Sequence, residues 1–243
     1  MNIWALCHGI THRKPMKANA WRVVEAQHVS SSRDLVDTLE EHELLEDLLE
    51  ASKPAMDTCQ HYLIFTPFRY PPLKYGSRFG HAFEPSLWYG SHDLETAFCE
   101  VAYYRLKFFS DTSANLGSSE IPMTVFSACL ESQASVDLTA PPFSDYQHLI
   151  SHQETYAYSQ TLGTQMRQAG IEMFYFSSAR STHQGKNIAA FTPTIFIKRN
   201  NQYITGMQSW RCFANKKSIE FWNGDSRRPT YSYRLTIEQG INQ

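Results

Sequence analysis

Glycine is scarce in this sequence. The 243 residues include 11 glycines, fewer than the ~7% that is usual in globular proteins. None of the glycine-rich phosphate-binding patterns occurs: the chain has neither G-x-G-x-x-G nor a Walker loop, and it also lacks the G-x-S-x-G nucleophile turn. The common Rossmann, P-loop and α/β-hydrolase chemistries therefore have no sequence support.

Paired cysteine motifs and long apolar runs are also missing. The five cysteines are odd in number and form no C-x-x-C, which argues against a zinc ribbon or a thioredoxin-type site and fits a reducing compartment. The N-terminus lacks the basic and apolar regions of a signal peptide, and no run approaches the ~20 apolar residues of a membrane helix. We expect a soluble cytoplasmic protein that does not associate with a membrane.

The charge is balanced overall but unevenly distributed. Lys and Arg number 22, Asp and Glu number 24, and the net charge is −2, so direct nucleic-acid binding is not expected. Residues 34–50 hold eight acids and no Lys or Arg; without these acids the net charge is +6. Leucines recur there at helical spacing, after the N-cap candidates 30–32 and before Pro54. We predict an acidic amphipathic helix, with a solvated face favoured over a homodimer contact or a contact with another protein.

This helix would belong to an N-terminal extension, residues 1–55, packed on a main domain of residues 56–243. The first thirty residues show no assignable periodicity. Strands outnumber helices in the rest, without regular alternation, which favours an α+β fold with a largely antiparallel sheet and flanking helices. Proline predicts extended chain at 68–72, and 198–201 is a hairpin-turn candidate. The expected strands are 62–65, 87–90, 122–130, 173–176, 193–197, 203–208, 219–222 and 231–237, and the expected helices are 94–109 and 155–169.

Neither a metal site nor a reactive cysteine is expected from the residue pattern. His8/His12 and His148/His152 have i, i+4 spacing, but neither pair lies in a strong helical pattern or an H-E-x-x-H arrangement. We therefore expect surface histidines and no metal. Cys99 lies beside a carboxylate that would raise the pKa of a thiol, so a structural role is the better interpretation.

One carboxylate stands out. In the helix expected to begin after the N-cap Asp93, Glu100 lies next to an inward stripe of Ala97, Val101, Tyr104 and Phe108, with no basic residue at i±3 or i±4. A carboxylate in such surroundings needs a distant cation or a function; the residues alone leave both open.

Arginines and a tyrosine could complement this carboxylate. Arg69 and Arg78 lie on aromatic-flanked segments, where guanidinium groups suit phosphate or pyrophosphate. Tyr89 could stack on a planar ligand. Each residue taken singly is more often structural.

Together these residues carry a family resemblance. The segments TPFRYPPLKYGSRFG (66–80), LWYGS (87–91) and ETAFCEVAYYR (95–105), followed by GIEMFYFSSAR (170–180) and NIAAFTP (187–193), resemble the RES domain. The match runs from about residue 60 to 200 with order and spacing preserved. By position, the family arginine falls on Arg78, its tyrosine on Tyr89, its glutamate on Glu100 and its serine on Ser178. The family often has proline before that serine, whereas this chain has Ser177, so the assignment could shift by one.

The resemblance implies a fold similar to ADP-ribosyltransferases, with NAD as substrate and no cofactor. It also implies the toxin half of a bacterial type II toxin–antitoxin pair, neutralised by an Xre-type helix-turn-helix antitoxin. The expected reaction is cleavage of the nicotinamide–ribose bond by hydrolysis or phosphorolysis, with Glu100 and Arg78 as catalytic residues and Tyr89, Ser178 and Arg69 contacting substrate. ADP-ribosyl transfer to a specific protein is the alternative within this class. A catalytically silent nucleotide- or antitoxin-binding module is the alternative outside it.

Overall fold

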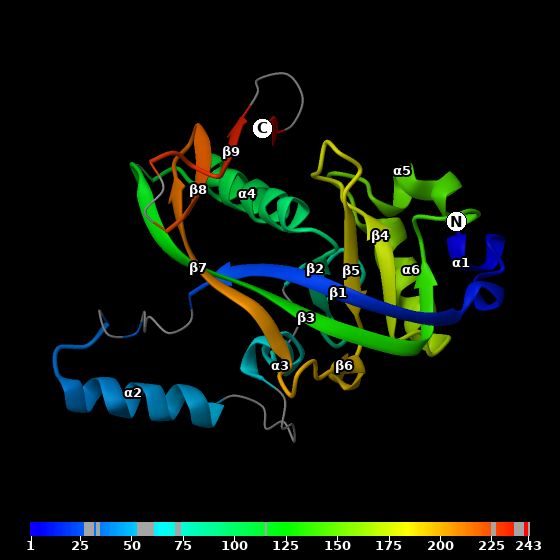
Figure 1. The fold of residues 1–243 in the computed structure, drawn as a ribbon, viewed down its shortest axis with the longest axis horizontal. Coiled ribbons are helices and arrows are strands. Elements are labelled where there is room, and N and C mark those ends of the chain that lie inside the picture. Colours follow the sequence, from blue (N-terminus) through cyan, green and yellow to red (C-terminus); the bar gives the residue numbers. More distant parts are fainter. Residues whose placement is uncertain are drawn as a thin grey trace.

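A ten-stranded sheet forms the frame of the molecule (Figure 1). The computed structural model describes residues 1–26, 32, 35–52, 61–70, 74–114, 116–224, 227–235 and 241–242. The strands are β1 (Lys14–Glu25), β2 (Trp88–Ser91), β3 (Ser119–Asp137), β4 (Met173–Ser177), β5 (Lys186–Ala190), β6 (Phe196–Ile197), β7 (Ile204–Ala214), β8 (Ser218–Asn223), β9 (Tyr231–Leu235) and β10 (Ile241–Asn242). The helices are α1 (Ile3–Leu6), α2 (Leu39–Ser52), α3 (Tyr62–Arg69), α4 (Leu94–Asp111), α5 (Gln147–Ile150) and α6 (Ala157–Gln168), with 3₁₀ turns at Gly9–His12, Phe143–Tyr146 and Pro193–Ile195.

The pairing of the strands is almost entirely antiparallel. Their order is β1-β2-β5-β4-β3-β7-β8-β9-β10, with β6 paired to β3, and β3 with β4 is the parallel pair among the described strands. Strand β1 pairs with both β2 and β3, so β1, β2, β5, β4 and β3 close into a ring. The predicted α+β class, with a largely antiparallel sheet and flanking helices, is confirmed.

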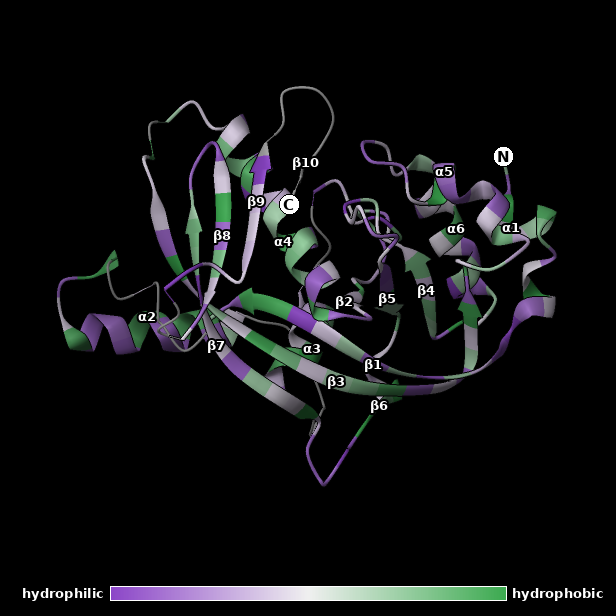
Figure 2. Ribbon diagram, turned by 45° about the horizontal axis from the view of Figure 1, so that its top comes forward, coloured by the Kyte–Doolittle hydropathy of each residue, from purple (hydrophilic) through white to green (hydrophobic). Residues whose placement is uncertain are grey.

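The long strand β3 divides the core into two sides because successive side chains point to opposite faces of a sheet. Met123 and Val125 pack with α4, whereas Phe126 and Ala128 pack with α3. A third cluster joins β4 to α1, α5 and α6. Figure 2 shows apolar residues, coloured green, along β3 and β4. Within the described ranges, every helix is too short or too polar to cross a bilayer.

Helix α3 corrects a prediction. Residues 62–65 were expected to form a strand and 68–72 to be extended, but 62–69 are helical and Tyr70 is extended; 71–73 lie outside the described residues. Pro67 lies inside this helix and cannot donate to the carbonyl of Leu63. The indole N–H of Trp88 donates to that carbonyl instead, at 3.3 Å. A tertiary contact thus satisfies the acceptor that proline leaves free, which local sequence cannot reveal.

Other elements differ less from expectation. Strands β1 and β5 were not predicted, and Pro193–Ile195 is a 3₁₀ turn rather than the start of a strand. The turn at 198–201 is confirmed: Asn200 and Asn201 both have positive φ, at 50° and 62°, as a tight hairpin turn requires. Helix α4 begins directly after the N-cap Asp93, as predicted, with the Asp93 Oδ1 accepting the Thr96 N–H at 2.8 Å.

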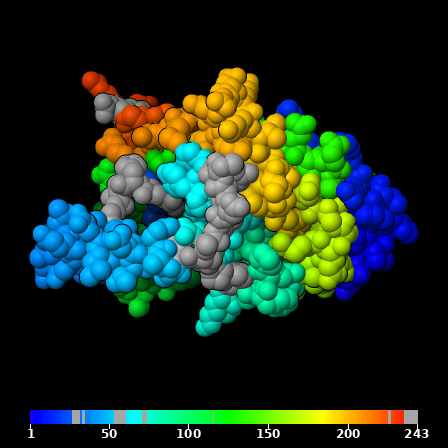
Figure 3. Space-filling view, turned by 90° about the horizontal axis from the view of Figure 1, so that it is seen from below, coloured from blue at the N-terminus to red at the C-terminus, as the bar shows by residue number. Residues whose placement is uncertain are grey.

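The acidic helix is α2. It lies at the edge of the molecule in Figure 3. Of its predicted flanking residues, 30, 31 and Pro54 lie outside the described part of the chain, as does the boundary between residues 55 and 56. The division into an extension and a main domain stays a prediction, although β1, from the extension, pairs with β3 over most of its length.

Candidate active site

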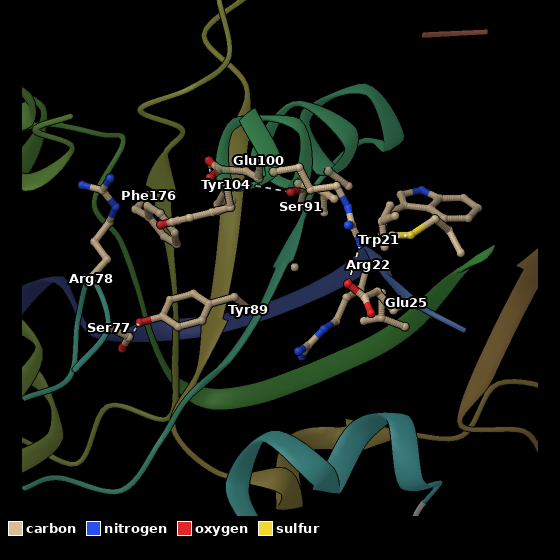
Figure 4. Close-up of a pocket in the computed structure, with 18 of the residues that line it drawn as sticks. Trp21, Arg22, Glu25, Ser77, Arg78, Tyr89, Ser91, Glu100, Tyr104 and Phe176 are labelled. Carbon is tan, nitrogen blue, oxygen red and sulfur yellow. Dashed lines mark hydrogen bonds and ion pairs between the residues drawn. The ribbon is translucent and has the colours of Figure 1, made fainter. Parts of the chain in front are cut away.

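A cavity of about 730 Å³ lies between β1, β2 and α4. Its volume is typical of small-molecule sites. Figure 4 shows Arg78 toward one end, Trp21 and Glu25 toward the other, and Tyr89 and Glu100 between them. Residues far apart in the sequence therefore converge on one space.

Glu100 lies on α4 and is held by two donors, one directly after β4 and one in β5. The same oxygen, Oε1, accepts from Ser178 Oγ and from Asn187 Nδ2, each at 2.6 Å. Hydrogen bonds to an ionised carboxylate are short and strong. The second oxygen, Oε2, has no hydrogen-bond partner among the described residues. The carboxylate is thus fixed at one oxygen while the other remains available to a ligand.

Asn187 and Ser178 are oriented by their own neighbours. In β5, Asn187 lies beside Ser91 of β2, whose hydroxyl donates to Asn187 Oδ1 at 2.7 Å. The Ser178 oxygen accepts the backbone N–H groups of Arg180 and Ser181 at 3.1 and 3.0 Å. Because these two bonds occupy acceptor positions, the Ser178 proton is directed to Glu100.

The two adjacent serines are distinguished by this geometry. Ser178 contacts Glu100, whereas Ser177 ends β4 and its backbone carbonyl accepts from Ser151 Oγ at 2.7 Å. The structure therefore brings Ser178, the residue assigned by resemblance, to the carboxylate.

Arg78 is buried on the cavity wall. Its Nη1 donates to the His152 carbonyl at 2.8 Å and approaches the Ile150 carbonyl at 3.5 Å. The guanidinium carbon lies 4.6 Å from the centre of the Tyr156 ring, a cation–π distance. Carbonyls and an aromatic ring, rather than a carboxylate, thus hold this cation in place.

Tyr89 is anchored through its hydroxyl. The Tyr89 oxygen accepts the Phe79 N–H at 3.1 Å and lies 2.9 Å from Ser77 Oγ. Burial raises the pKa of Tyr89 to about 12, so the phenol is neutral at physiological pH. Its ring is partly exposed on the cavity wall and meets Phe176 edge-on at 6.2 Å.

Arg69 is not brought to this cavity. It lies near the end of α3, where its Nη1 is 2.8 Å from the Glu50 carboxylate of α2. The helical conformation of 62–69, which replaces the predicted extended chain, places Arg69 toward α2. Of the five predicted site residues, the structure gathers Arg78, Tyr89, Glu100 and Ser178.

The face of α4 that lines the cavity was expected to be core. Ala97, Val101, Tyr104 and Phe108 all border the cavity, and Tyr104 and Phe108 are 52% and 61% exposed. The buried side of α4 is a neighbouring stripe: Phe98, Ala102, Leu106 and Phe109. The predicted inward face is therefore correct for Ala97, which is buried, but Tyr104 and Phe108 point toward an open space rather than into packed side chains.

Arg22, in the unpredicted strand β1, also belongs to the site but is not among the residues predicted from the sequence. Arg22 lines the cavity, and its guanidinium lies 5.1 Å from the Trp88 ring centre. Its Nη1 is buried and has no hydrogen-bond partner in the described part of the chain. Burial lowers the pKa of Arg22 to about 10, which leaves it charged at neutral pH. A buried N–H donor of a cation that has no hydrogen-bond acceptor among the described residues costs free energy, so this one points to an anionic ligand.

Thiol chemistry finds no support in the geometry. Cys99 is buried and donates to the Arg180 carbonyl at 2.9 Å. Burial raises the pKa of Cys99 to about 12, so the thiolate is not formed near neutral pH. Among the described residues, no three His, Cys, Asp or Glu side chains gather as a metal site requires.

Comparison with known proteins supplies a family and a fold. The family model of the RES domain matches residues 55–213, more than half of the chain. A solved structure titled the M. tuberculosis MbcT–MbcA toxin–antitoxin complex is similar, with a TM-score of 0.50 and 10% sequence identity. The similarity covers 86% of this chain and 90% of that one, and at this identity it shows a shared fold. No curated protein matches.

Proposed function

This chain belongs to the RES domain family, and from that premise we propose that it cleaves NAD at the nicotinamide–ribose bond as the toxin half of a bacterial toxin–antitoxin pair. The observation that supports the proposal most is the Glu100 carboxylate, held through one oxygen by Ser178 and Asn187. It lies on the wall of a cavity that is also lined by Arg22, Arg78 and Tyr89.

The proposed chemistry follows from the charge that develops during cleavage. The bond between ribose C1′ and the nicotinamide nitrogen breaks, and nicotinamide leaves as a neutral base with the bonding electron pair. Positive charge then develops on the ribose, and a fixed carboxylate close to the sugar stabilises it. In this proposal the free Oε2 of Glu100 faces the sugar or its 2′-hydroxyl. An oxygen of water or phosphate forms the new bond to C1′, and where water adds, it releases one proton to the solvent.

The surrounding residues provide complementary contacts. The cations of Arg78 and Arg22 would bind the diphosphate, since guanidinium groups pair well with phosphate oxygens. Arg22 is the stronger candidate of the two because its buried Nη1 is unpaired in the described structure. The exposed part of the Tyr89 ring would pack on nicotinamide, and Ser178 would position the nicotinamide ribose through Glu100.

Product analysis tests this proposal. Purified protein is incubated with NAD in phosphate-free and in phosphate buffer, and the products are identified by chromatography. Nicotinamide with ADP-ribose indicates hydrolysis, and nicotinamide with ADP-ribose 1-phosphate indicates phosphorolysis; both support bond cleavage. Label from radioactive NAD on a discrete protein of a lysate would instead indicate ADP-ribosyl transfer. Binding of NAD without nicotinamide release would refute the catalytic proposal and favour a silent nucleotide-binding module.

The proposed partner is an Xre-type helix-turn-helix antitoxin. The support is family membership, together with a fold shared with a protein whose structure is titled a toxin–antitoxin complex. We expect co-expression with the helix-turn-helix protein of a neighbouring gene to restore growth of cells that express this chain. Equal growth arrest with and without that protein would contradict this assignment.

A further inference from the structure

Helix α2 carries leucines on a side that faces solvent. Leu44 and Leu48 are each 60% exposed, Leu49 is 43% exposed, and none of the helix's residues is buried. With Leu45 they stand at positions i, i+1, i+4 and i+5, so they share one side of the helix. We call Leu44, Leu45, Leu48 and Leu49 the leucine face. Single exposed leucines are ordinary, but a contiguous row on a helix without buried residues indicates an interaction surface.

The opposite side of α2 is acidic, and two of its carboxylates contact other segments of the chain. Glu43, Glu46, Asp47 and Glu50 follow the spacing i, i+3, i+4 and i+7. The Glu50 carboxylate pairs with Arg69 of α3 at 2.8 Å, and the Glu46 carboxylate accepts a hydrogen bond from Ser32. A surface helix normally turns its apolar side to the core and its charges outward. Here the leucines are as exposed as the acids, since the side chains of Glu46 and Glu50 are 48% and 59% exposed, and Figure 3 shows α2 projecting at the edge of the molecule.

We propose that the leucine face docks an amphipathic helix of a partner protein whose apolar side is flanked by Lys or Arg. The leucine spacing provides the apolar contacts of a helix–helix interface, and charges beside such an interface select the partner. Residues 34–50 contain eight acids and no Lys or Arg. Two copies of α2 would bring like charges together, and an anionic membrane would be repelled, whereas a helix with basic flanks is attracted.

The first test uses the full-length protein and two designed helical peptides of about 18 residues, or five turns. Both peptides carry the same row of leucines, one flanked by lysine and the other by glutamate. Fluorescence anisotropy should show binding of the lysine peptide, weakened by salt, and at least tenfold weaker binding of the glutamate peptide. Equal binding of the two peptides, or binding of neither, would overturn the proposal.

The second test removes the apolar contacts while keeping the helix. Glutamine has a helix propensity close to that of leucine, so Leu44→Gln/Leu48→Gln should retain the circular dichroism of the wild type. We expect at least tenfold weaker binding of the lysine peptide. The matched control, Leu6→Gln/Leu116→Gln, changes two exposed leucines elsewhere and should bind like wild type. Unchanged binding by Leu44→Gln/Leu48→Gln would show that charge attraction alone accounts for binding, and it would refute the proposal.

Two further results separate this surface from the alternatives. Sedimentation that shows a wild-type dimer, converted to a monomer by Leu44→Gln/Leu48→Gln, would assign the leucine face to a second copy of the chain and overturn the proposal. Binding is independent of NAD chemistry, because α2 contributes no residue to the cavity wall. A Glu100→Gln variant should therefore bind the lysine peptide like wild type.

Discussion

Asn187 offers the sharpest test of how the carboxylate is positioned. Its side chain is 3% exposed and links two groups: Nδ2 donates to Glu100 Oε1 at 2.6 Å, and Oδ1 accepts from Ser91 at 2.7 Å. Asn187→Ala removes one of the two donors that hold the carboxylate. Asn187→Asp keeps the shape but replaces the donor with a second negative charge.

The size of the effect follows from the bond that is lost. A hydrogen bond to a charged group contributes ~1.5–3 kcal/mol, which corresponds to a loss of about 10- to 150-fold in kcat for Asn187→Ala if the bond acts fully in the transition state. The aspartate variant should lose more, because two carboxylates at hydrogen-bond distance repel each other. A positioning residue should lower kcat more than it raises KM for NAD.

The assay is nicotinamide release over a range of NAD concentrations, with unfolding measured in denaturant on the same samples. Asn215→Ala is the matched control. Asn215 Oδ1 accepts the backbone N–H groups of Lys217 and Ser218 at 2.8 and 3.0 Å, so its loss should cost stability without changing kcat. Wild-type kcat in Asn187→Ala, or a kcat loss in Asn215→Ala of the same size, would refute the reasoning.

Three other predictions concern the walls of the site. Gly163→Ala would place Cβ 2.0 Å from the Phe79 carbonyl oxygen; we expect a loss of ~1–3 kcal/mol in denaturant unfolding, and wild-type stability would contradict this contact. Because the pKa of Tyr89 rises from its ordinary 10 to about 12, the folded protein retains a proton that the unfolded chain loses. The stabilisation is complete below pH 10 and falls as the pH rises toward 12, and Tyr89→Phe should remove this part of the pH dependence of unfolding. Burial raises the pKa of Cys99 to about 12, so iodoacetamide at pH 8 should modify Cys99 only after unfolding in urea, as peptide mass spectrometry can check; rapid modification of the folded protein would disprove the burial argument.

The residues of the site could be predicted where their signal was local. Asp93 as a helix cap, a helix that carries Glu100, and a short strand that carries Tyr89 follow from capping and hydrophobic pattern alone. The arrangement of these residues around one cavity could not be predicted, because it depends on pairings such as β2 with β5 that join distant segments.

Other errors had a common cause, the dominance of tertiary contacts over local pattern. The apolar residues 62–65 fit a strand as well as a buried helix. The helix can contain Pro67 because the Trp88 indole donates to the carbonyl that proline leaves without a partner. Arg22 lies in a strand whose end, residues 21–24, shows no apolar–polar alternation, since β1 packs against core clusters on both faces. The apolar stripe on α4 predicts core packing, but two of its residues, Tyr104 and Phe108, border an open cavity.

The most direct test of the central claim compares nicotinamide release by three forms of the protein. Glu100→Gln removes the charge of the carboxylate in the cavity, whereas Glu95→Gln removes a half-exposed carboxylate on the same helix that lies outside the cavity wall. We predict that Glu100→Gln lowers the rate by about 10²- to 10⁴-fold and that Glu95→Gln retains the wild-type rate. Equal rates for wild type and Glu100→Gln would contradict the assignment of this carboxylate to NAD cleavage.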